Sequence, residues 1–162
     1  LRYRDRVVLE VGECLIPRLT TLTHRLISVR VQLLVEETFQ VVGTLSGNVC
    51  ETIAFINNGE ASTAASRAGL ALMLEHVAKN GLQGLPAAWA HLVDQEEKIY
   101  EFSKGDLRLF FFKGHGNQIA VCTSGVMKKK QKVDKAAVAK AIASRNAYFA
   151  AVLTNSVEVI SS

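Results

Sequence analysis

The chain has few of the residues that build disulfide frameworks or zinc sites. Its 162 residues include only three cysteines, which are widely spaced and outside any CxxC pattern: Cys14, Cys50 and Cys122. The four histidines show no metal-ligand spacing: His24, His76, His91 and His115. We therefore expect free thiols, no metal and no cofactor, as in a protein of a reducing cytoplasm.

Long apolar runs are also missing. No stretch reaches the roughly 18 residues that a membrane-spanning helix needs, so no membrane partner is expected. The arginine-rich start lacks the apolar core and cleavage site of a signal peptide. A hydrophobic content of 49% with 21% charged residues is typical of a globular protein, and the length fits one domain with a short appendage.

Lysine is absent from residues 1–35, which contain six arginines, whereas the rest of the chain has ten lysines and three arginines. This break predicts an N-terminal extension of unknown role. The segment "LISVRVQLLVEE" within it fits either a strand or a short helix. We expect the main domain to cover residues 36–155, followed by a tail at 156–162.

Charge is divided unevenly along that domain. Residues 36–97 contain eight acidic and two basic residues, a net charge of −6, whereas residues 98–148 contain three acidic and eleven basic residues, a net charge of +8. A basic segment of this kind can form a polyanion-binding face, for which nucleic acid is the commonest partner. The alternative is a solvated charged surface.

The patterns of apolar and turn residues predict an α+β domain. In chain order we expect a strand at 38–47, a helix at 48–57 with Asn48 as N-cap, an amphipathic helix at 60–81, a connection at 81–97, strands at 98–102, 107–113 and 118–126, and a helix at 133–153 with Asp134 as N-cap. The two early helices should form a hairpin on one face of a sheet that is antiparallel or mixed. Alternation along "LRLFFFK" should place Arg108, Phe110 and Phe112 on one face of the sheet.

A lysine cluster follows the last predicted strand: Lys128, Lys129, Lys130 and Lys132. Mutual repulsion can lower the pKa of one lysine so that it acts as a base, while its neighbours and Arg108 stabilise a phosphorane-like transition state. Such a site can cleave RNA by promoting attack of the RNA's own 2′-OH on the adjacent phosphate. Nonspecific RNA affinity remains an equal alternative, and Tyr148 in the last helix fits either a core position or a surface for base stacking.

The segment "KIYEFSKGDLRLFFFKGHGNQIAVCTSGVMKKKQKVDKAAVAKAIASRNAYF" resembles the C-terminal half of the RelE/ParE toxin superfamily, in its HigB-like, phage-associated branch. The matching elements are Tyr100-Glu101-Phe102, Arg108 with the following Leu-Phe-Phe-Phe, the lysine cluster, and Ala141 to Tyr148. The upstream strand and helix hairpin fit the same domain, so the resemblance covers about residues 38–152. It implies a RelE-like fold: a strand and helix hairpin on an antiparallel or mixed sheet with a C-terminal helix.

The resemblance also implies a function: the toxin of a type II toxin–antitoxin pair, acting as an mRNA endoribonuclease (mRNA interferase) on the ribosome. The expected partners are mRNA, the ribosome and a cognate antitoxin, with a helix-turn-helix protein as the type to look for. The implied catalytic residues are Arg108, Lys128, Lys129, Lys132 and Tyr148. Further RNA-binding candidates are Lys104, Lys113, Lys130, Lys135 and Arg145.

Three positions depart from the family pattern. Ser103 replaces an arginine, Val126-Met127 replaces an aromatic residue, and Asp134 replaces a proline. Two other functions therefore stay open on the same scaffold: a ParE-like inhibitor of DNA gyrase, and a noncatalytic RNA- or protein-binding module.

Overall fold

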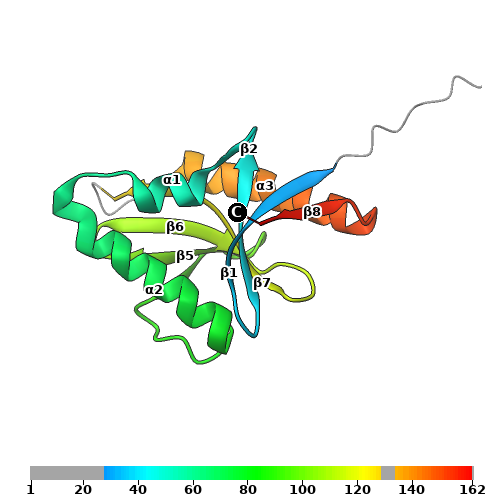
Figure 1. Ribbon diagram of the computed structural model, residues 1–162. Coiled ribbons are helices and arrows are strands. Elements are labelled where there is room, and N and C mark those ends of the chain that lie inside the picture. Colours follow the sequence, from blue (N-terminus) through cyan, green and yellow to red (C-terminus); the bar gives the residue numbers. More distant parts are fainter. Residues whose placement is uncertain (1–27, 129–133, 162) are drawn as a thin grey trace, which may run out of the picture.

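The computed structural model describes residues 28–128 and 134–161 (Figure 1). Within them the chain forms eight strands, three α-helices and one turn of 3-10 helix. In chain order these are β1 (Val29–Glu36), β2 (Gln40–Ser46), β3 (Val49–Cys50), α1 (Glu51–Asn57), the 3-10 turn (Ala61–Thr63), α2 (Ala64–Asn80), β4 (Ala90–Asp94), β5 (Ile99–Lys104), β6 (Leu107–Phe112), β7 (Gln118–Met127), α3 (Lys135–Leu153) and β8 (Val157–Ile160).

The strands form one mixed sheet in the order β4-β5-β6-β7-β2-β1-β8, with β3 paired to β2 outside this path. Strands β4 to β7 are an antiparallel meander, as the tight turns predicted. Two pairings are parallel: β2 with β7, and β1 with β8. The expected α+β class with a mixed sheet is confirmed.

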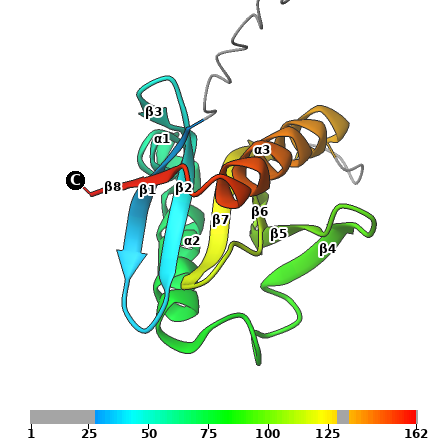
Figure 2. The ribbon, with the colours of Figure 1, turned by 90° about the vertical axis from the view of Figure 1, so that its right-hand side faces the viewer.

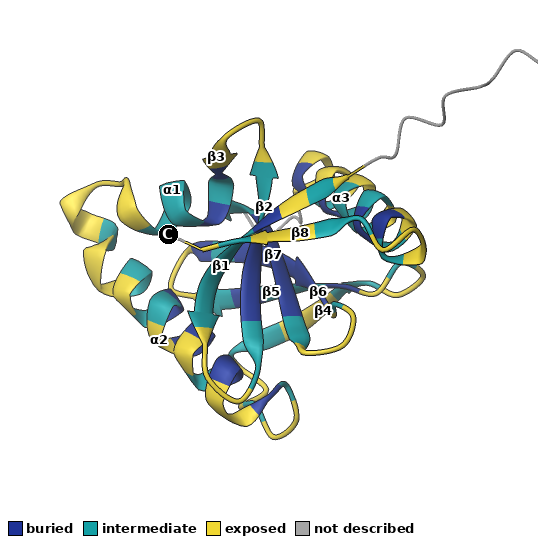
Figure 3. Ribbon diagram, turned by 45° about the vertical axis from the view of Figure 1, so that its right-hand side comes forward, coloured by how far each residue is buried: buried dark blue, intermediate teal, exposed yellow. Residues whose placement is uncertain are grey.

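Helices cover both faces of the sheet (Figure 2). Helix α2 buries Leu70, Leu74 and Val77 against Phe102, Leu109 and Phe111, and side chains of α1 pack against this same cluster. Helix α3 covers the other face, where its buried Tyr148 lies among Phe110, Phe112 and Val121. The central strands are the most deeply buried part of the molecule (Figure 3).

The alternation predicted for β6 is therefore correct. Leu107, Leu109 and Phe111 belong to the cluster under α2, while Phe110 and Phe112 belong to the cluster under α3. Because side chains alternate along a strand, Arg108 lies on the α3 face.

Of the two predicted helix N-caps, one is confirmed and one is wrong. Asp134 caps α3 as expected, since one carboxylate oxygen accepts hydrogen bonds from the N–H groups of Ala136 and Ala137 at 3.0 and 3.1 Å. Asn48 does not cap α1; the N-cap is Cys50, without a side-chain bond. The connection expected at 81–97 contains an edge strand, β4.

The sheet also runs past both predicted boundaries of the domain. Strand β1 comes from the expected N-terminal extension and pairs antiparallel with β2. Strand β8 comes from the expected tail and pairs with β1 from Val29–Val157 to Gln32–Ile160. Residues on both sides of the predicted limits, 36 and 155, thus belong to one sheet.

Candidate nucleic-acid interface

Arg108 lies near the start of β6, at the end of the sheet that carries the β5–β6 turn. It pairs with Ser103 on β5 and with Val126 on β7. Its Nη1 donates hydrogen bonds to the carbonyl oxygens of Gly105 and Leu107, at 2.7 and 2.8 Å. The guanidinium is therefore fixed against the turn rather than free in solvent.

An acidic partner balances the charge of Arg108. Its Nε lies 3.4 Å from Oε1 of Glu101, and the exposed fractions of the two side chains are 16% and 12%. This contact is an ion pair without hydrogen-bond alignment, because Nε is buried and has no hydrogen-bond partner. Ser103 donates a long hydrogen bond of 3.4 Å to the same carboxylate oxygen.

Lys128 is attached to the same end of the sheet. Its backbone N–H donates to the carbonyl oxygen of Asp106 at 2.7 Å, which extends the β6–β7 pairing by one bond beyond Met127. Lys128 is half-buried and follows Val126, the cross-strand partner of Arg108, by two residues. We call Arg108 and Lys128 the basic end of the sheet.

Three members of the lysine cluster lie outside the described residues: Lys129, Lys130 and Lys132. The structure describes the residues on either side of them. Lys128 precedes the gap, and the exposed Lys135 begins α3 after it, at the same end of the sheet as the β5–β6 turn (Figure 1).

Tyr148 lies at the opposite end of the β6–β7 hairpin. Its hydroxyl accepts a hydrogen bond from the N–H of His115 at 3.0 Å and donates one to Oε1 of Gln118. Only 1% of Tyr148 is exposed, and its ring meets Phe112 edge to face at 5.5 Å. Phe112, which this ring contacts, is four residue steps along β6 from Arg108, or about 13 Å.

This placement argues against the catalytic role that the resemblance implied for Tyr148. A buried phenol at the far end of the hairpin does not reach RNA held at the basic end. Burial also raises the pKa of Tyr148, so the phenol stays protonated at neutral pH. The structure supports the core position that the helix pattern also allowed.

The remaining RNA-binding candidates are scattered. The Lys104 side chain lies against Gly69 of α2, where an added Cβ would be 2.7 Å from its Cε. Lys113 lies beyond the far end of β6, with Nζ 5.6 Å from the centroid of the Tyr100 ring. Arg145 pairs with Glu97 at 3.2 Å and stacks over Phe149. Lys104 thus lies at the same end of the sheet as Arg108 but on the α2 face, whereas Lys113 and Arg145 lie away from Arg108.

The sequence analysis did not identify the residues that pair with Arg108 and with the Tyr148 hydroxyl. Glu101 neutralises Arg108, and its place in β5 next to "LRLFFF" would have suggested this pairing once the strand register was known. Gln118 and His115 hold the Tyr148 hydroxyl, and no pattern in the sequence pointed to them.

The described cysteines are free and buried. Desolvation by burial raises the pKa of both thiols, Cys122 and Cys50. Neither is therefore a ready nucleophile. Among residues 28–128 and 134–161 there is no group of three or more His, Cys, Asp or Glu side chains that could hold a metal ion, and no helix long and apolar enough to cross a membrane.

A scan against known protein families finds none that matches this chain, and a search of characterised proteins finds no significant match.

Proposed function

We propose that this chain is a RelE-like toxin domain that binds mRNA through its basic end and cleaves it. The observation that carries the proposal is the fixed placement of Arg108 and Lys128 on neighbouring strands, one held by the carbonyls of the β5–β6 turn and the other by Asp106. The order of a strand (β2), two helices, the meander and a helix also supports the proposal, although β1, β3, β4 and β8 are additional to it.

The proposed reaction needs no group other than cations and a base. The base removes the proton of an RNA 2′-OH, whose oxygen attacks the adjacent phosphorus. The bond to the 5′ oxygen breaks, which leaves a 2′,3′-cyclic phosphate on one fragment, and the departing 5′ oxygen takes a proton from water. Arg108 and Lys128 would stabilise the added negative charge on the phosphoryl oxygens. We assign the base to the cluster of Lys129, Lys130 and Lys132.

A second candidate is a noncatalytic RNA-binding module. Two observations favour it: Glu101 already neutralises the charge of Arg108, and Tyr148 is buried away from the basic end. In this case RNA binds with the usual salt dependence of phosphate contacts but remains intact.

Induction of the gene in cells separates these candidates. Nuclease activity predicts growth arrest and new mRNA 5′ ends within translated codons, and both should be lost in Lys129→Ala and reduced in Arg108→Gln. Lys79→Ala is the matched control, since Lys79 is an exposed lysine in the last turn of α2.

Each other outcome identifies a competing function. Growth arrest with DNA damage and intact transcripts would favour the gyrase inhibitor. Salt-sensitive RNA binding by the purified chain, with no new 5′ ends on ribosomes, would favour the noncatalytic module. If Lys129→Ala and Arg108→Gln changed nothing while both remained folded, the catalytic assignment would be wrong.

A further inference from the structure

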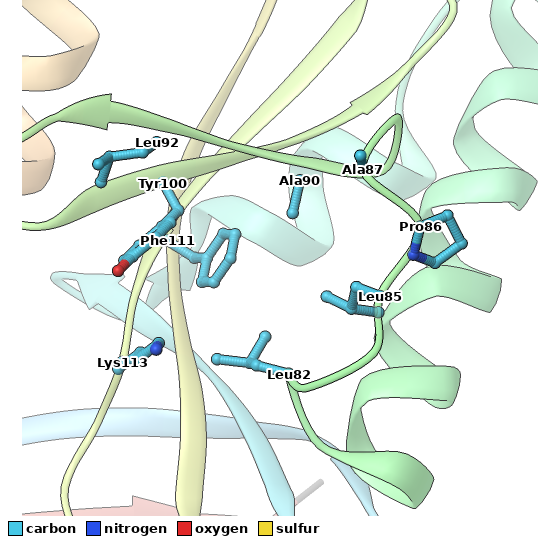
Figure 4. Close-up of a pocket in the computed structure, with 9 residues that line it drawn as sticks. All are labelled: Leu82, Leu85, Pro86, Ala87, Ala90, Leu92, Tyr100, Phe111 and Lys113. Carbon is cyan, nitrogen blue, oxygen red and sulfur yellow. The ribbon is translucent and has the colours of Figure 1, made fainter.

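A cavity of about 230 Å³ lies on the face of the sheet away from Arg108, between β4, β5, β6 and the 81–89 connection (Figure 4). The connection crosses this face without regular structure. It leaves α2 through Gly81 and turns again at Gly84, both with φ of 78°, a conformation that favours glycine. The chain therefore spans the gap between α2 and β4 without filling it.

Most of the side chains that line the cavity are apolar. Leu82, Leu85 and Ala90 point into it from the connection and from β4, in front of the ring of Phe111 (Figure 4). Phe111 is only 1% exposed, and its ring stacks on Phe102 with centroids 4.0 Å apart. This floor is rigid, because the sheet and the stacked rings hold it.

One charged side chain, Lys113, lines this cavity. Lys113 is the one ionisable side chain besides Tyr100 that lines the cavity, and its Nζ lies 5.6 Å from the centroid of the Tyr100 ring. Among the described residues no carboxylate is paired with Lys113 in an ion pair. A site lined mainly by apolar side chains and one cation complements a ligand with an apolar body and one negative charge.

We propose that this cavity binds a small carboxylate with an aryl or branched alkyl group. The apolar group lies against Phe111 and Leu85, and the carboxylate pairs with Lys113. The volume is below the roughly 300–1,000 Å³ of typical ligand sites, so the ligand is small. The inference does not depend on the proposed function, since the cavity and the basic end lie on opposite faces of the sheet.

The full chain carries its own probe for this site. Trp89 is its single tryptophan, and its neighbour Ala90 lines the cavity. Titration with 3-phenylpropanoate should give a saturable change in Trp89 fluorescence. The neutral 3-phenylpropanamide, which has the same apolar body, should bind more weakly.

Matched variants test the two parts of the site. Lys113→Met keeps the apolar stem and should weaken the carboxylate about two- to fivefold, the usual range for an exposed ion pair, while leaving the amide unchanged. Ala90→Leu should fill the cavity and abolish binding of both probes, with Ala87→Leu as a second filling variant. Lys79→Met should bind as the unchanged chain does.

Circular dichroism establishes that each variant is folded before titration. A fluorescence change that does not saturate, or that persists in folded Ala90→Leu and Ala87→Leu, overturns the site. An equal loss of both probes in Lys113→Met overturns the assignment of the carboxylate to Lys113.

Discussion

The two ends of the β6–β7 hairpin use their polar groups differently. At the basic end, Arg108 and Lys128 lie beside a turn, where their backbone and side-chain bonds fix cations close to the surface. At the Tyr148 end, defined by Tyr148, His115 and Gln118, the hydroxyl is enclosed and both of its hydrogen bonds stay within the protein. The basic end can bind an anionic ligand, whereas the hydrogen bonds at the Tyr148 end connect α3 to the sheet.

The difference shows the limit of assigning roles to individual residues from a family resemblance. Arg108 and Tyr148 come from the same motif set, yet they lie at opposite ends of one hairpin, and the hydrogen bonds of their side chains go to different residues. The strand of Arg108 and the helix of Tyr148 form where the sequence predicted them, whereas a joint catalytic role of the two residues does not follow from their positions.

The largest expected effect is at the Tyr148 end. Tyr148→Ala removes a fully buried ring from between α3 and Phe112, and should lower the free energy of unfolding by about 3–5 kcal/mol. Urea denaturation followed by circular dichroism measures this loss. A change below about 1 kcal/mol would mean that Tyr148 is not part of the core.

At the basic end, Arg108→Met leaves the Glu101 carboxylate nearly buried without its partner. We expect a loss of about 2 kcal/mol, measured in the same way. The double variant Arg108→Met/Glu101→Gln should recover part of that loss, because it removes the unpaired charge. If the double variant were less stable than the single one, the ion pair would not explain the effect.

Removing only the hydroxyl of Tyr148 should have a smaller effect. Tyr148→Phe loses the bonds to His115 and Gln118, at a cost of about 1 kcal/mol at neutral pH. Because burial raises the folded-state pKa of Tyr148 above its unfolded value, the folded chain keeps this proton longer as pH rises. Stability linked to Tyr148 is therefore complete below the unfolded pKa, near 10, and is lost above it.

The unfolding free energy of Tyr148→Phe should accordingly fall less steeply above pH 10 than that of the unchanged chain. The buried thiols Cys50 and Cys122 are present in both proteins, so their raised pKa values contribute equally. Parallel slopes in the two proteins would contradict the burial of the Tyr148 phenol.

Lys128→Ala should have the smallest effect on folding, within about 0.5 kcal/mol, because the bond to Asp106 uses the backbone. RNA affinity should fall, and the slope of log affinity against log salt should shrink by about 0.7 for single-stranded RNA. Fluorescence anisotropy with a labelled oligonucleotide measures both. An unchanged slope would remove Lys128 from the interface.

Local patterns in the sequence predicted much of the fold. Alternation in "LRLFFFK" placed Arg108 on the correct face, and Asp134 before an alanine-rich run predicted the start of α3. These features depend on neighbours in the chain, which the sequence displays directly.

Long-range pairing accounts for most of what was missed. The segment at 157–160, Val-Glu-Val-Ile, is rich in β-branched residues but only four residues long, and nothing near it in the chain indicates that its partner is β1. The Arg108–Glu101 pair likewise depends on the β5–β6 register. The position of Tyr148 relative to the lysines depends on how α3 packs along the sheet, which no local pattern records.

Strand β8 has a practical consequence for handling this protein. A fragment ending at residue 155 would keep α3 but leave the outer side of β1 without its partner from Val29 to Gln32. The backbone N–H and C=O groups exposed there, beside the buried Val31, form a template for intermolecular strand addition. Such a shortened chain should self-associate and precipitate, so expression of the domain should retain the strand through Ile160.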